Sequence, residues 1–148
     1  MADTMKRILV VDDDTGILES TKQILELEGY DVDTAQTATE GLEKIGTNYY
    51  HLGLFDIKLP DMEGTELLQR SQKIRPGMKK IMVTGFASLE NSVISLNAGA
   101  DAYILKPVDP FMLIAKVKEK LDEQDKEKAI DGEKVAEFLE EKLLDVKR

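Results

Sequence analysis

Short apolar runs alternate along the chain with longer segments in which apolar residues recur every three or four positions. The short runs have the length and composition of strands buried on both faces, and the longer segments have the period of an amphipathic helix. Gly29, Gly46 and Gly99 are typical helix stops. The predicted strands span 7–11, 31–35, 51–55, 80–84 and 102–105, and the predicted helices span 17–27, 38–45, 64–74, 88–97 and a last segment that Asp109 caps.

This alternation of strand and helix predicts a doubly wound α/β fold. A strand followed by a helix, repeated along the chain, favours a parallel sheet with right-handed crossovers and with helices on both faces. In such sheets, ligands bind beyond the carboxyl ends of the strands. The residues at the end of each predicted strand are therefore the first candidates for chemistry.

Most of the predicted strands end in polar residues that can take part in chemistry. Each of these residues has an ordinary explanation when it is taken alone. Asp14 or Thr15 favours a helix cap, a threonine is common at a strand end, and a single lysine is usually a solvated charge. Several such residues at corresponding strand ends instead predict one site, made of Asp12, Asp13, Asp56, Thr84 and Lys106.

The acidic residues at this edge predict a site for a hard cation. Clustered carboxylates repel one another unless a cation lies among them, and Mg²⁺ favours one or two carboxylates together with waters and a phosphate oxygen. A carboxylate beside Mg²⁺ can attack phosphorus and form an aspartyl phosphate, and Asp56 is the candidate for that role. Lys106 would then neutralise the phosphoryl oxygens, and the Thr84 hydroxyl would donate a hydrogen bond to them.

Four stretches of the sequence resemble the receiver domain of two-component response regulators. They read ILVVDDD, LFDIKLPDMEG, IMVTGFAS and GADAYILKP, and they follow one another in the family's order between Lys6 and Leu121. The resemblance implies a flavodoxin-like sheet with strand order 2-1-3-4-5 and a receiver over residues 1–121. The remaining residues, 122–148, form a C-terminal extension that we expect to be helical from its own pattern. The resemblance also implies a phosphoacceptor switch that uses Mg²⁺, takes its phosphoryl group from a sensor histidine kinase or phosphotransfer protein, and catalyses only its own phosphorylation and dephosphorylation.

The resemblance assigns the acceptor and the metal ligands. Asp56 is the phosphoacceptor and also a metal ligand, Asp13 binds the metal directly, and Asp12 binds it through water. The backbone carbonyl of Lys58 is a further ligand. Lys58 and Phe86 lie at positions that border the path of the attacking water in this family, so slow self-dephosphorylation is expected.

The resemblance also assigns the residues that bind the phosphoryl group and transmit the signal. Lys106 and Thr84 bind that group, and Thr84 is in addition a switch residue. Tyr103 matches the aromatic switch position, although a half-buried strand tyrosine without that role is the plainer alternative. The peptide bond between Lys106 and Pro107 is often cis in this family.

Two other interpretations of the acidic residues stay open. The stretch VDDDTG resembles the DxDxT opening of haloacid-dehalogenase-type phosphatases, in which Asp12 would be the nucleophile and Asp14 the acid. That interpretation leaves Asp56 without a role, and a Lys-Pro pair stands late in the chain where those enzymes have a second acidic pair. The other interpretation is a pseudo-receiver that binds partners without phosphorylation, which the intact set of acids, hydroxyl and lysine disfavours.

Composition narrows the classes of partner. The chain has 148 residues, a net charge of −9 and no cysteine, which excludes a disulfide framework and disfavours direct binding of nucleic acid. No apolar run reaches membrane-spanning length and the N-terminus lacks a signal-peptide pattern, so we expect a cytoplasmic protein that does not bind membranes. His51, the only histidine, is expected at the surface.

The segment after Leu121 is strongly charged, with ten acidic and six basic residues over 122–148. Gly132 predicts a break in its helix. Beyond the break, apolar residues at steps of three and four predict a helix with one apolar face, and a helix this short needs a partner. Two arrangements stay open: the helix folds back onto its own receiver, or it docks in trans to form a weak homodimer or to hold an unknown effector. The apolar positions are Val135, Phe138, Leu139, Leu143 and Val146.

Overall fold

A five-stranded parallel sheet forms the centre of the computed structural model, which describes residues 5–85 and 99–147. The strands lie in the order β2-β1-β3-β4-β5, which confirms the expected topology. β3 is shifted by one residue from its predicted position and β4 begins one residue earlier, while the other strands match their predictions. The strands are β1 (Arg7–Val11), β2 (Asp31–Ala35), β3 (Leu52–Asp56), β4 (Lys79–Thr84) and β5 (Ala102–Leu105).

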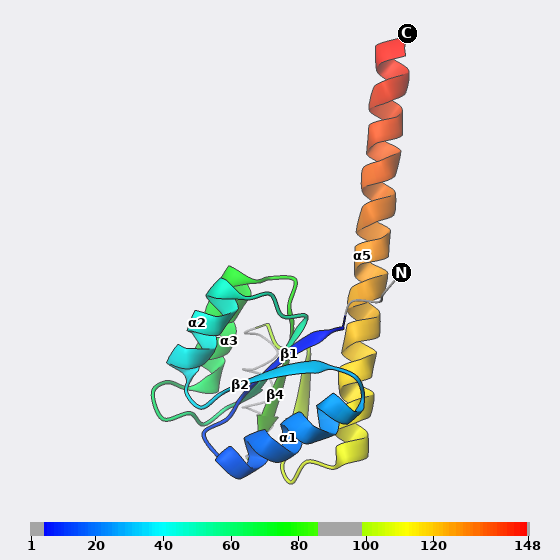
Figure 1. Cartoon of the computed structure of the whole chain (residues 1–148). Helices are drawn as coiled ribbons and strands as arrows, with labels where there is room; N and C mark the ends of the chain where they lie inside the picture. Colours follow the sequence, from blue (N-terminus) through cyan, green and yellow to red (C-terminus); the bar gives the residue numbers. More distant parts are fainter. Residues whose placement is uncertain (1–4, 86–98, 148) are drawn as a thin grey trace.

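The described helices cover both faces of the sheet, as Figure 1 shows. α1 (Thr15–Leu27) and α5 (Pro110–Lys147) lie on one face, and α2 (Ala38–Thr47) and α3 (Gly64–Ile74) lie on the other. The arrangement confirms the predicted doubly wound fold. The helix predicted over 88–97, and Phe86, lie outside the described residues.

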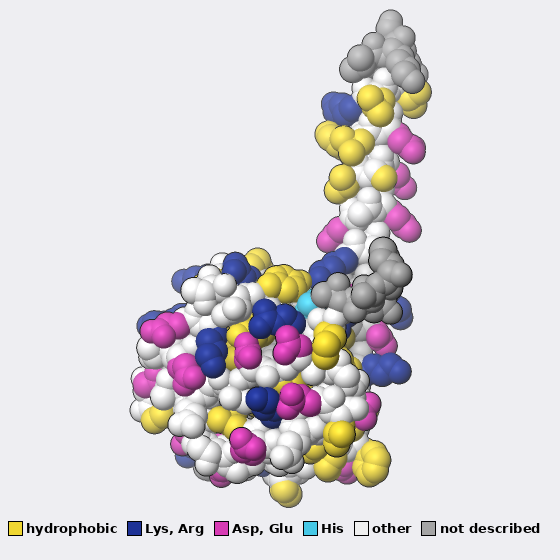
Figure 2. Space-filling model, in the orientation of Figure 1, with side chains coloured by type: hydrophobic (Ala, Val, Ile, Leu, Met, Phe, Trp, Pro, Cys, Tyr) yellow, Lys and Arg dark blue, Asp and Glu magenta, His cyan; other side chains and the backbone are white. Residues whose placement is uncertain are grey.

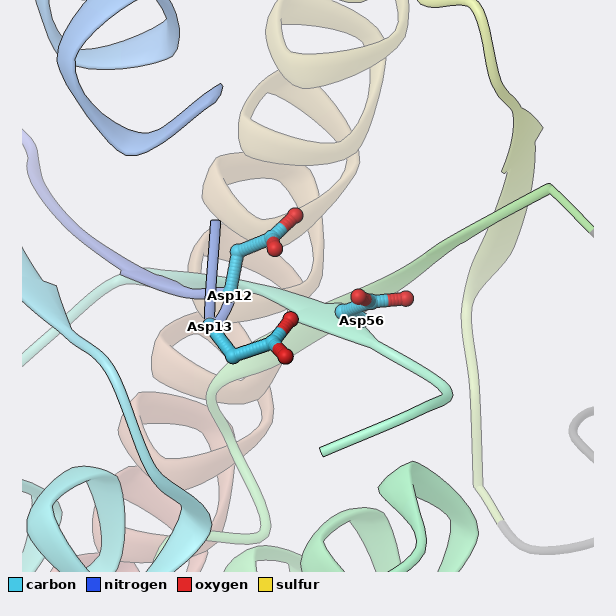
Figure 3. Close-up of side chains that lie close together, drawn as sticks. All are labelled: Asp12, Asp13 and Asp56. Carbon is cyan, nitrogen blue, oxygen red and sulfur yellow. The ribbon is translucent and has the colours of Figure 1, made fainter. Parts of the chain in front are cut away.

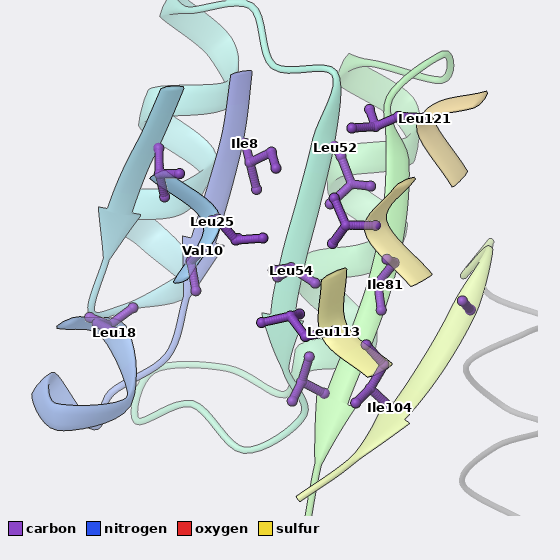
Figure 4. Close-up of a cluster of buried hydrophobic side chains, with 14 residues drawn as sticks. Ile8, Val10, Leu18, Leu25, Leu52, Leu54, Ile81, Ile104, Leu113 and Leu121 are labelled. Carbon is purple, nitrogen blue, oxygen red and sulfur yellow. The ribbon is translucent and has the colours of Figure 1, made fainter. Parts of the chain in front are cut away.

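Each face of the sheet carries its own hydrophobic core. Along β1, Ile8 and Val10 pack with the α1 and α5 side, whereas Leu9 and Val11 pack with the α2 and α3 side, as strand alternation requires. Full burial of one such side chain stabilises the fold by about 1.5–3 kcal/mol. Figure 4 shows the first core, in which α1 and α5 cover the strands with Leu18, Leu25, Leu113, Val117 and Leu121.

Polar caps fix where two of the helices begin. Asp14 Oδ1 accepts a hydrogen bond from the Ile17 backbone N–H at 3.1 Å, and Asp109 Oδ1 accepts one from Phe111 N–H at 2.8 Å. Both caps confirm predictions. Gly29 follows α1 with a φ of 93°, a conformation that favours glycine, and so ends that helix as predicted.

The prediction that His51 lies at the surface is wrong. Its side chain is only 9% exposed, and its Nδ1 accepts a hydrogen bond from the Arg7 backbone N–H at 3.0 Å. Its ring contacts Tyr49 edge-on, and Gln124 Nε2 of α5 donates to its carbonyl at 2.8 Å. His51 lies just before a central strand that α5 covers, so its place in the sheet decides its burial.

The predicted break at Gly132 is also wrong, because α5 runs without interruption from Pro110 to Lys147. One glycine costs a helix only about 1 kcal/mol relative to alanine, and the residues within four positions of Gly132 include Lys, Ala and Glu, which favour helix. The end of α5 projects away from the sheet (Figure 1), so the folded-back arrangement is not found. Despite this length, no helix in the described ranges is apolar enough to cross a membrane.

Candidate functional site

Three carboxylates converge at the carboxyl ends of β1 and β3. Val11 pairs with Phe55 in the sheet, so Asp12 and Asp13 emerge beside Asp56 (Figure 3). One oxygen of each carboxylate lies within 4.8 Å of the others. Asp12 and Asp56 are buried and Asp13 is exposed. The structure therefore brings together the acids that the sequence predicted, with hard oxygen donors open to solvent on one side.

Lys106 joins this cluster from β5, two strands away from β3. Its Nζ lies 2.9 Å from Asp12 Oδ2 and 3.3 Å from Asp56 Oδ2. The Lys106 backbone N–H donates to the Thr84 carbonyl at 2.8 Å, and the peptide bond to Pro107 is cis, as expected. The ammonium group thus contacts the Asp56 carboxylate directly.

Burial and like charge shape the acidity of the site. Burial, followed by the negative charge of Asp12, raises the pKa of Asp56, and Lys106 opposes this only in part. Burial lowers the pKa of Lys106, but its hydrogen bond to Asp12 and the charge of Asp56 outweigh burial and leave that pKa raised. Lys106 therefore stays cationic at neutral pH. The carboxylates remain only partly compensated, which suits a site that accepts a divalent cation.

The two predicted switch residues lie on neighbouring strands. Thr84 is the last residue of β4, is 1% exposed, and pairs in register with Leu105. Tyr103 pairs with Met82 of β4, and its half-buried ring packs against the core on the α2 and α3 side. Thr84 thus lies at the carboxyl edge of the sheet near the acids, and Tyr103 lies deeper along the adjacent strand.

The turn after Asp56 is tightly closed. The Gly64 N–H donates to the Ile57 carbonyl at 2.6 Å, and Lys58 and Glu63 form an isolated antiparallel bridge. A Cβ at Gly64 would lie 2.3 Å from the Asp56 carbonyl oxygen, so only glycine fits there. The turn holds the Lys58 backbone next to Asp56, and the Lys58 N–H donates to Asp56 Oδ1 at 3.4 Å.

Asp14 takes no part in the carboxylate cluster. Its side chain caps α1, and its own backbone N–H donates to Asp12 Oδ1 at 2.9 Å. A haloacid-dehalogenase-type mechanism would require Asp14 as a free acid beside Asp12. The capping role of Asp14 and the convergence on Asp56 both disfavour that interpretation.

A family model for the response regulator receiver domain matches residues 8–118 of the chain. The chain belongs to this family. Receiver domains are the phosphoacceptor switches of two-component systems, not enzymes that turn over a separate substrate. They bind Mg²⁺ at their acidic pocket and receive phosphoryl groups from histidine kinases. The resemblance that the four sequence stretches carry is therefore confirmed.

Solved structures of receiver domains match the fold closely. A CheY-like response regulator receiver domain protein from Methanospirillum hungatei JF-1 is 72% identical, with a TM-score of 0.82 over 84% of this chain and 99% of that chain. The BeF3-activated receiver domain of DrrB is 33% identical, with a TM-score of 0.76 over 80% of this chain and 99% of that chain.

The curated relatives are longer than this chain. Response regulator ArlR of Staphylococcus saprophyticus is 35% identical over 86% of this chain and 57% of its own length. Transcriptional regulatory protein GlrR of Escherichia coli K12 is 33% identical over 78% of this chain and 26% of its own length. The chain therefore spans between about a quarter and somewhat more than half of these two relatives.

One residue near the site has a role that the sequence did not indicate. Asp61 lies in the turn after Asp56, and its carboxylate accepts hydrogen bonds from Ala38 N–H at 2.9 Å and from Thr39 N–H at 2.8 Å. N–H groups in the first turn of a helix have no acceptor within the helix, and Asp61 supplies one for two of them at the start of α2. A clue was available in the sequence: an Asp in a turn is a common acceptor for backbone N–H groups, although its partner cannot be read from the chain.

Proposed function

We propose that Asp56 of this receiver accepts the phosphoryl group and that Asp12, Asp13 and the Lys58 carbonyl complete its Mg²⁺ site. The observation that carries the proposal is the convergence of three carboxylates and the Lys106 ammonium from three separate strands. An ordinary surface cluster would not bury Asp12 and Asp56 together with a cation 2.9 and 3.3 Å away. The donor set suits Mg²⁺, which favours carboxylate and carbonyl oxygens.

The transfer step follows from these positions. An Asp56 carboxylate oxygen forms a new P–O bond, the P–N bond to a phosphohistidine of the donor protein breaks, and the released imidazole takes up a proton. Bound Mg²⁺ supplies positive charge beside the phosphoryl oxygens. Lys106 loses its contact with the Asp56 carboxylate and ion-pairs with a phosphoryl oxygen instead, and Thr84 donates its hydroxyl hydrogen to another. Hydrolysis of the acyl phosphate by water restores Asp56.

The signal leaves the site through Thr84 and Tyr103. A new dianion at Asp56 draws the Thr84 hydroxyl toward it, and the Tyr103 ring turns inward on the neighbouring strand. This is a shift between two packings of the same sheet edge, biased by one charge change. The half-buried position of Tyr103 against the α2 and α3 core supports this role, because a fully buried ring would have no second position.

The phosphoryl donor is a sensor histidine kinase or a phosphotransfer protein, and it must reach Asp56 beside Lys106. A hollow of about 210 Å³ lies next to Lys106 between α1 and the start of α5, and its lining includes Ile17, Ile24, Pro107 and Val108. Apolar contact there would place a donor helix over the acceptor. The chain then works in the cytoplasm as a receiver over residues 1–121 with an extension over 122–148. It does not itself bind nucleic acid or a membrane.

Intact-mass measurement tests the acceptor assignment. The full chain is incubated with acetyl phosphate and Mg²⁺, and one added phosphoryl group is expected. Asp56→Asn should abolish the gain in mass, whereas Asp14→Asn, which alters the adjacent helix cap, should retain it. A phosphoryl group that persists in Asp56→Asn but is lost in Asp12→Asn would overturn the proposal in favour of the phosphatase-like nucleophile.

A further inference from the structure

The extension of α5 is fixed where it leaves the receiver. Gln124 Nε2 donates to the carbonyls of both His51 and Gly77 at 2.8 Å. Three ionic or polar contacts follow within one turn, and they reach the amino-terminal edge of the sheet. They join Lys6 to Asp125 at 2.7 Å, Lys79 to Glu127 at 2.9 Å, and Lys128 to the Tyr49 hydroxyl at 3.0 Å. The receiver therefore sets the direction in which the extension projects.

Beyond Lys128 the extension leaves large apolar side chains open to solvent. Figure 2 shows hydrophobic side chains gathered along one side of the extension and acidic side chains along the other. A helix with an open apolar side needs a cover, and its own receiver does not supply one. The exposed fractions on the apolar side are 58% for Val135, 57% for Phe138, 54% for Leu139 and 60% for Leu143.

The sizes of the residues change from one end of the extension to the other. Ala129, Gly132 and Ala136 come first, and Leu139 and Leu143 follow, at steps of three and four residues. This is the spacing of the contact positions in a two-stranded helical pair. The space around Gly132 is open, since no atom lies within 4 Å of a Cβ placed there. The small residues therefore leave a shallow depression on the helix surface, and the two leucines project from the same row of positions.

A second copy of the helix packs well against this row of positions only when it runs in the opposite direction. Two copies side by side in the same direction would set small residues against small ones and leave a gap. In opposite directions, Gly132 and Ala136 each meet a leucine of the partner copy, and the space between the two helices is filled evenly. The register that achieves this sets position 132 opposite position 143, and position 136 opposite position 139.

We propose that two copies of this chain associate through the 129–143 face of α5 as an antiparallel helix pair. An overlap of residues 128–147 is about 30 Å long. Such a seam buries less than the roughly 1,200 Å² of a standard interface, so the dissociation constant should be micromolar or weaker. Each segment over 122–148 carries a net charge of −4, and the two repel one another. Added salt should therefore tighten the pair.

Sedimentation equilibrium of the full chain across protein and salt concentration tests the association. Leu139→Glu should weaken it at least about tenfold. Leu144→Glu is the matched control, because Leu144 is similarly exposed, at 59%, but lies outside the contact positions. Equal behaviour of the native chain and both variants would overturn the proposal. Phosphorylation at Asp56, read by mass, should proceed in all three, which separates this test from that of the acceptor site.

Cysteine cross-linking tests the direction of the pair, because the native chain has no cysteine. Gly132→Cys and Leu143→Cys are made in separate chains and oxidised alone and as a mixture. The mixture should form a disulfide-linked dimer, whereas Gly132→Cys alone should not, since its two sulfurs would lie about 16 Å apart along the axis. Cross-linking of Gly132→Cys alone would show a parallel pair, and no cross-linking in the mixture would overturn the pairing itself.

Discussion

Asp61, in the turn that follows Asp56, accepts a hydrogen bond from the Thr39 backbone N–H at 2.8 Å and a second one from the Thr39 hydroxyl. Those hydrogen bonds, led by the one from the hydroxyl, lower the pKa of Asp61 to about 2. The carboxylate thus stays ionised throughout the physiological range. It ties the turn that carries the Lys58 carbonyl to the first turn of α2, which the sheet and the second core hold in place.

Loss of the hydrogen bonds between Asp61 and the first turn of α2 should weaken Mg²⁺ binding. Asp61→Ala frees the turn between Asp56 and Gly64, so we expect the dissociation constant for Mg²⁺ to rise roughly threefold or more. Thr37→Ala is the matched control, because it removes the other α2 cap, the 3.1 Å bond from Glu40 N–H, without touching the turn. That control should cost about 1 kcal/mol of stability and leave Mg²⁺ affinity unchanged. Calorimetric titration measures the Mg²⁺ affinity of both variants. Equal affinities in Asp61→Ala and in the native chain would exclude a positioning role for Asp61.

The general fold could be predicted from the sequence because its two determinants are local. Residues 8–11 and 81–83 are continuous apolar runs, as strands covered on both faces require. The acids were found because the carboxyl ends of parallel strands meet at one edge. Alternation alone did not fix the strand order, which came from the resemblance to receiver domains.

The two errors and the unforeseen contacts of Asp61 concern residues whose environment is set by distant parts of the chain or by the rest of a long helix. His51 is buried because Gln124 and Arg7 contact it, and both lie far from it in the sequence. Asp61 finds its partners more than twenty residues earlier. Gly132 lies inside a helix whose other residues outweigh its low helix propensity. A local pattern gives no information on such contacts, or on which of several propensities prevails.

Replacement of the cation at the acidic site should slow phosphorylation. Lys106→Met keeps the length of the side chain but removes the charge that lies 3.3 Å from Asp56. We expect the rate of phosphorylation by acetyl phosphate to fall by about 10- to 100-fold, because one neutralising group of the transition state is lost. Mg²⁺ should bind at least as tightly, since a competing cation is gone. Lys116→Met, which breaks a surface pair with Glu119, is the control, and an unchanged rate in Lys106→Met would refute the role of Lys106.

A second lysine is buried away from the site, and its Nζ forms no ion pair with a carboxylate within residues 5–85 and 99–147. Lys80 is 0% exposed, and its Nζ donates to Gln72 Oε1 at 2.6 Å and to the carbonyls of Arg75 and Met78 at 3.1 and 2.7 Å. It therefore joins the end of α3 to the start of β4. The pKa of Lys80 is lowered to about 8, chiefly by burial; the charge of Asp101 opposes this shift, and the charge of Lys79 adds to it.

Stability should consequently depend on pH through Lys80. Below pH 8 the lysine is protonated in both states, and the native state bears the cost of burying the charge. Above pH 8 it is neutral in the native state but still protonated in the unfolded chain, so its contribution to the free energy of unfolding rises up to about pH 10.5. The stability of the native chain relative to Lys80→Met should increase by about 1–3 kcal/mol from pH 7.5 to pH 10.5, measured by urea unfolding. Lys118→Met, at an exposed position, is the control and should show no such change. If the difference in unfolding free energy between the native chain and Lys80→Met does not vary with pH, the lowered pKa of Lys80 is contradicted.

Beryllofluoride, which mimics the phosphoryl group, should act on both switch residues. Its binding at Asp56 with Mg²⁺ should shift the amide resonances of Thr84 and Tyr103 in NMR spectra, because the Thr84 hydroxyl moves toward the new charge. Thr84→Ala should retain the shifts around Asp56 and lose those at Tyr103. If the native chain shows changes only around the acids, Tyr103 is an ordinary strand residue and the switch proposal fails.

Lys58 should slow the hydrolysis of the aspartyl phosphate and so lengthen its lifetime. Its side chain is exposed two residues after Asp56, and its backbone N–H contacts Asp56 Oδ1 at 3.4 Å. A long cationic side chain there, together with a bulky ring at position 86, would crowd the approach of the attacking water. Lys58→Asn combined with Phe86→Glu should therefore speed hydrolysis by about tenfold, which equals about 1.4 kcal/mol in the barrier. Lys58→Arg keeps the length and charge and should retain the native rate. Decay of the phosphorylated form is followed by mass after removal of acetyl phosphate, and an equal or slower loss in the double variant would show that these side chains do not limit the access of water.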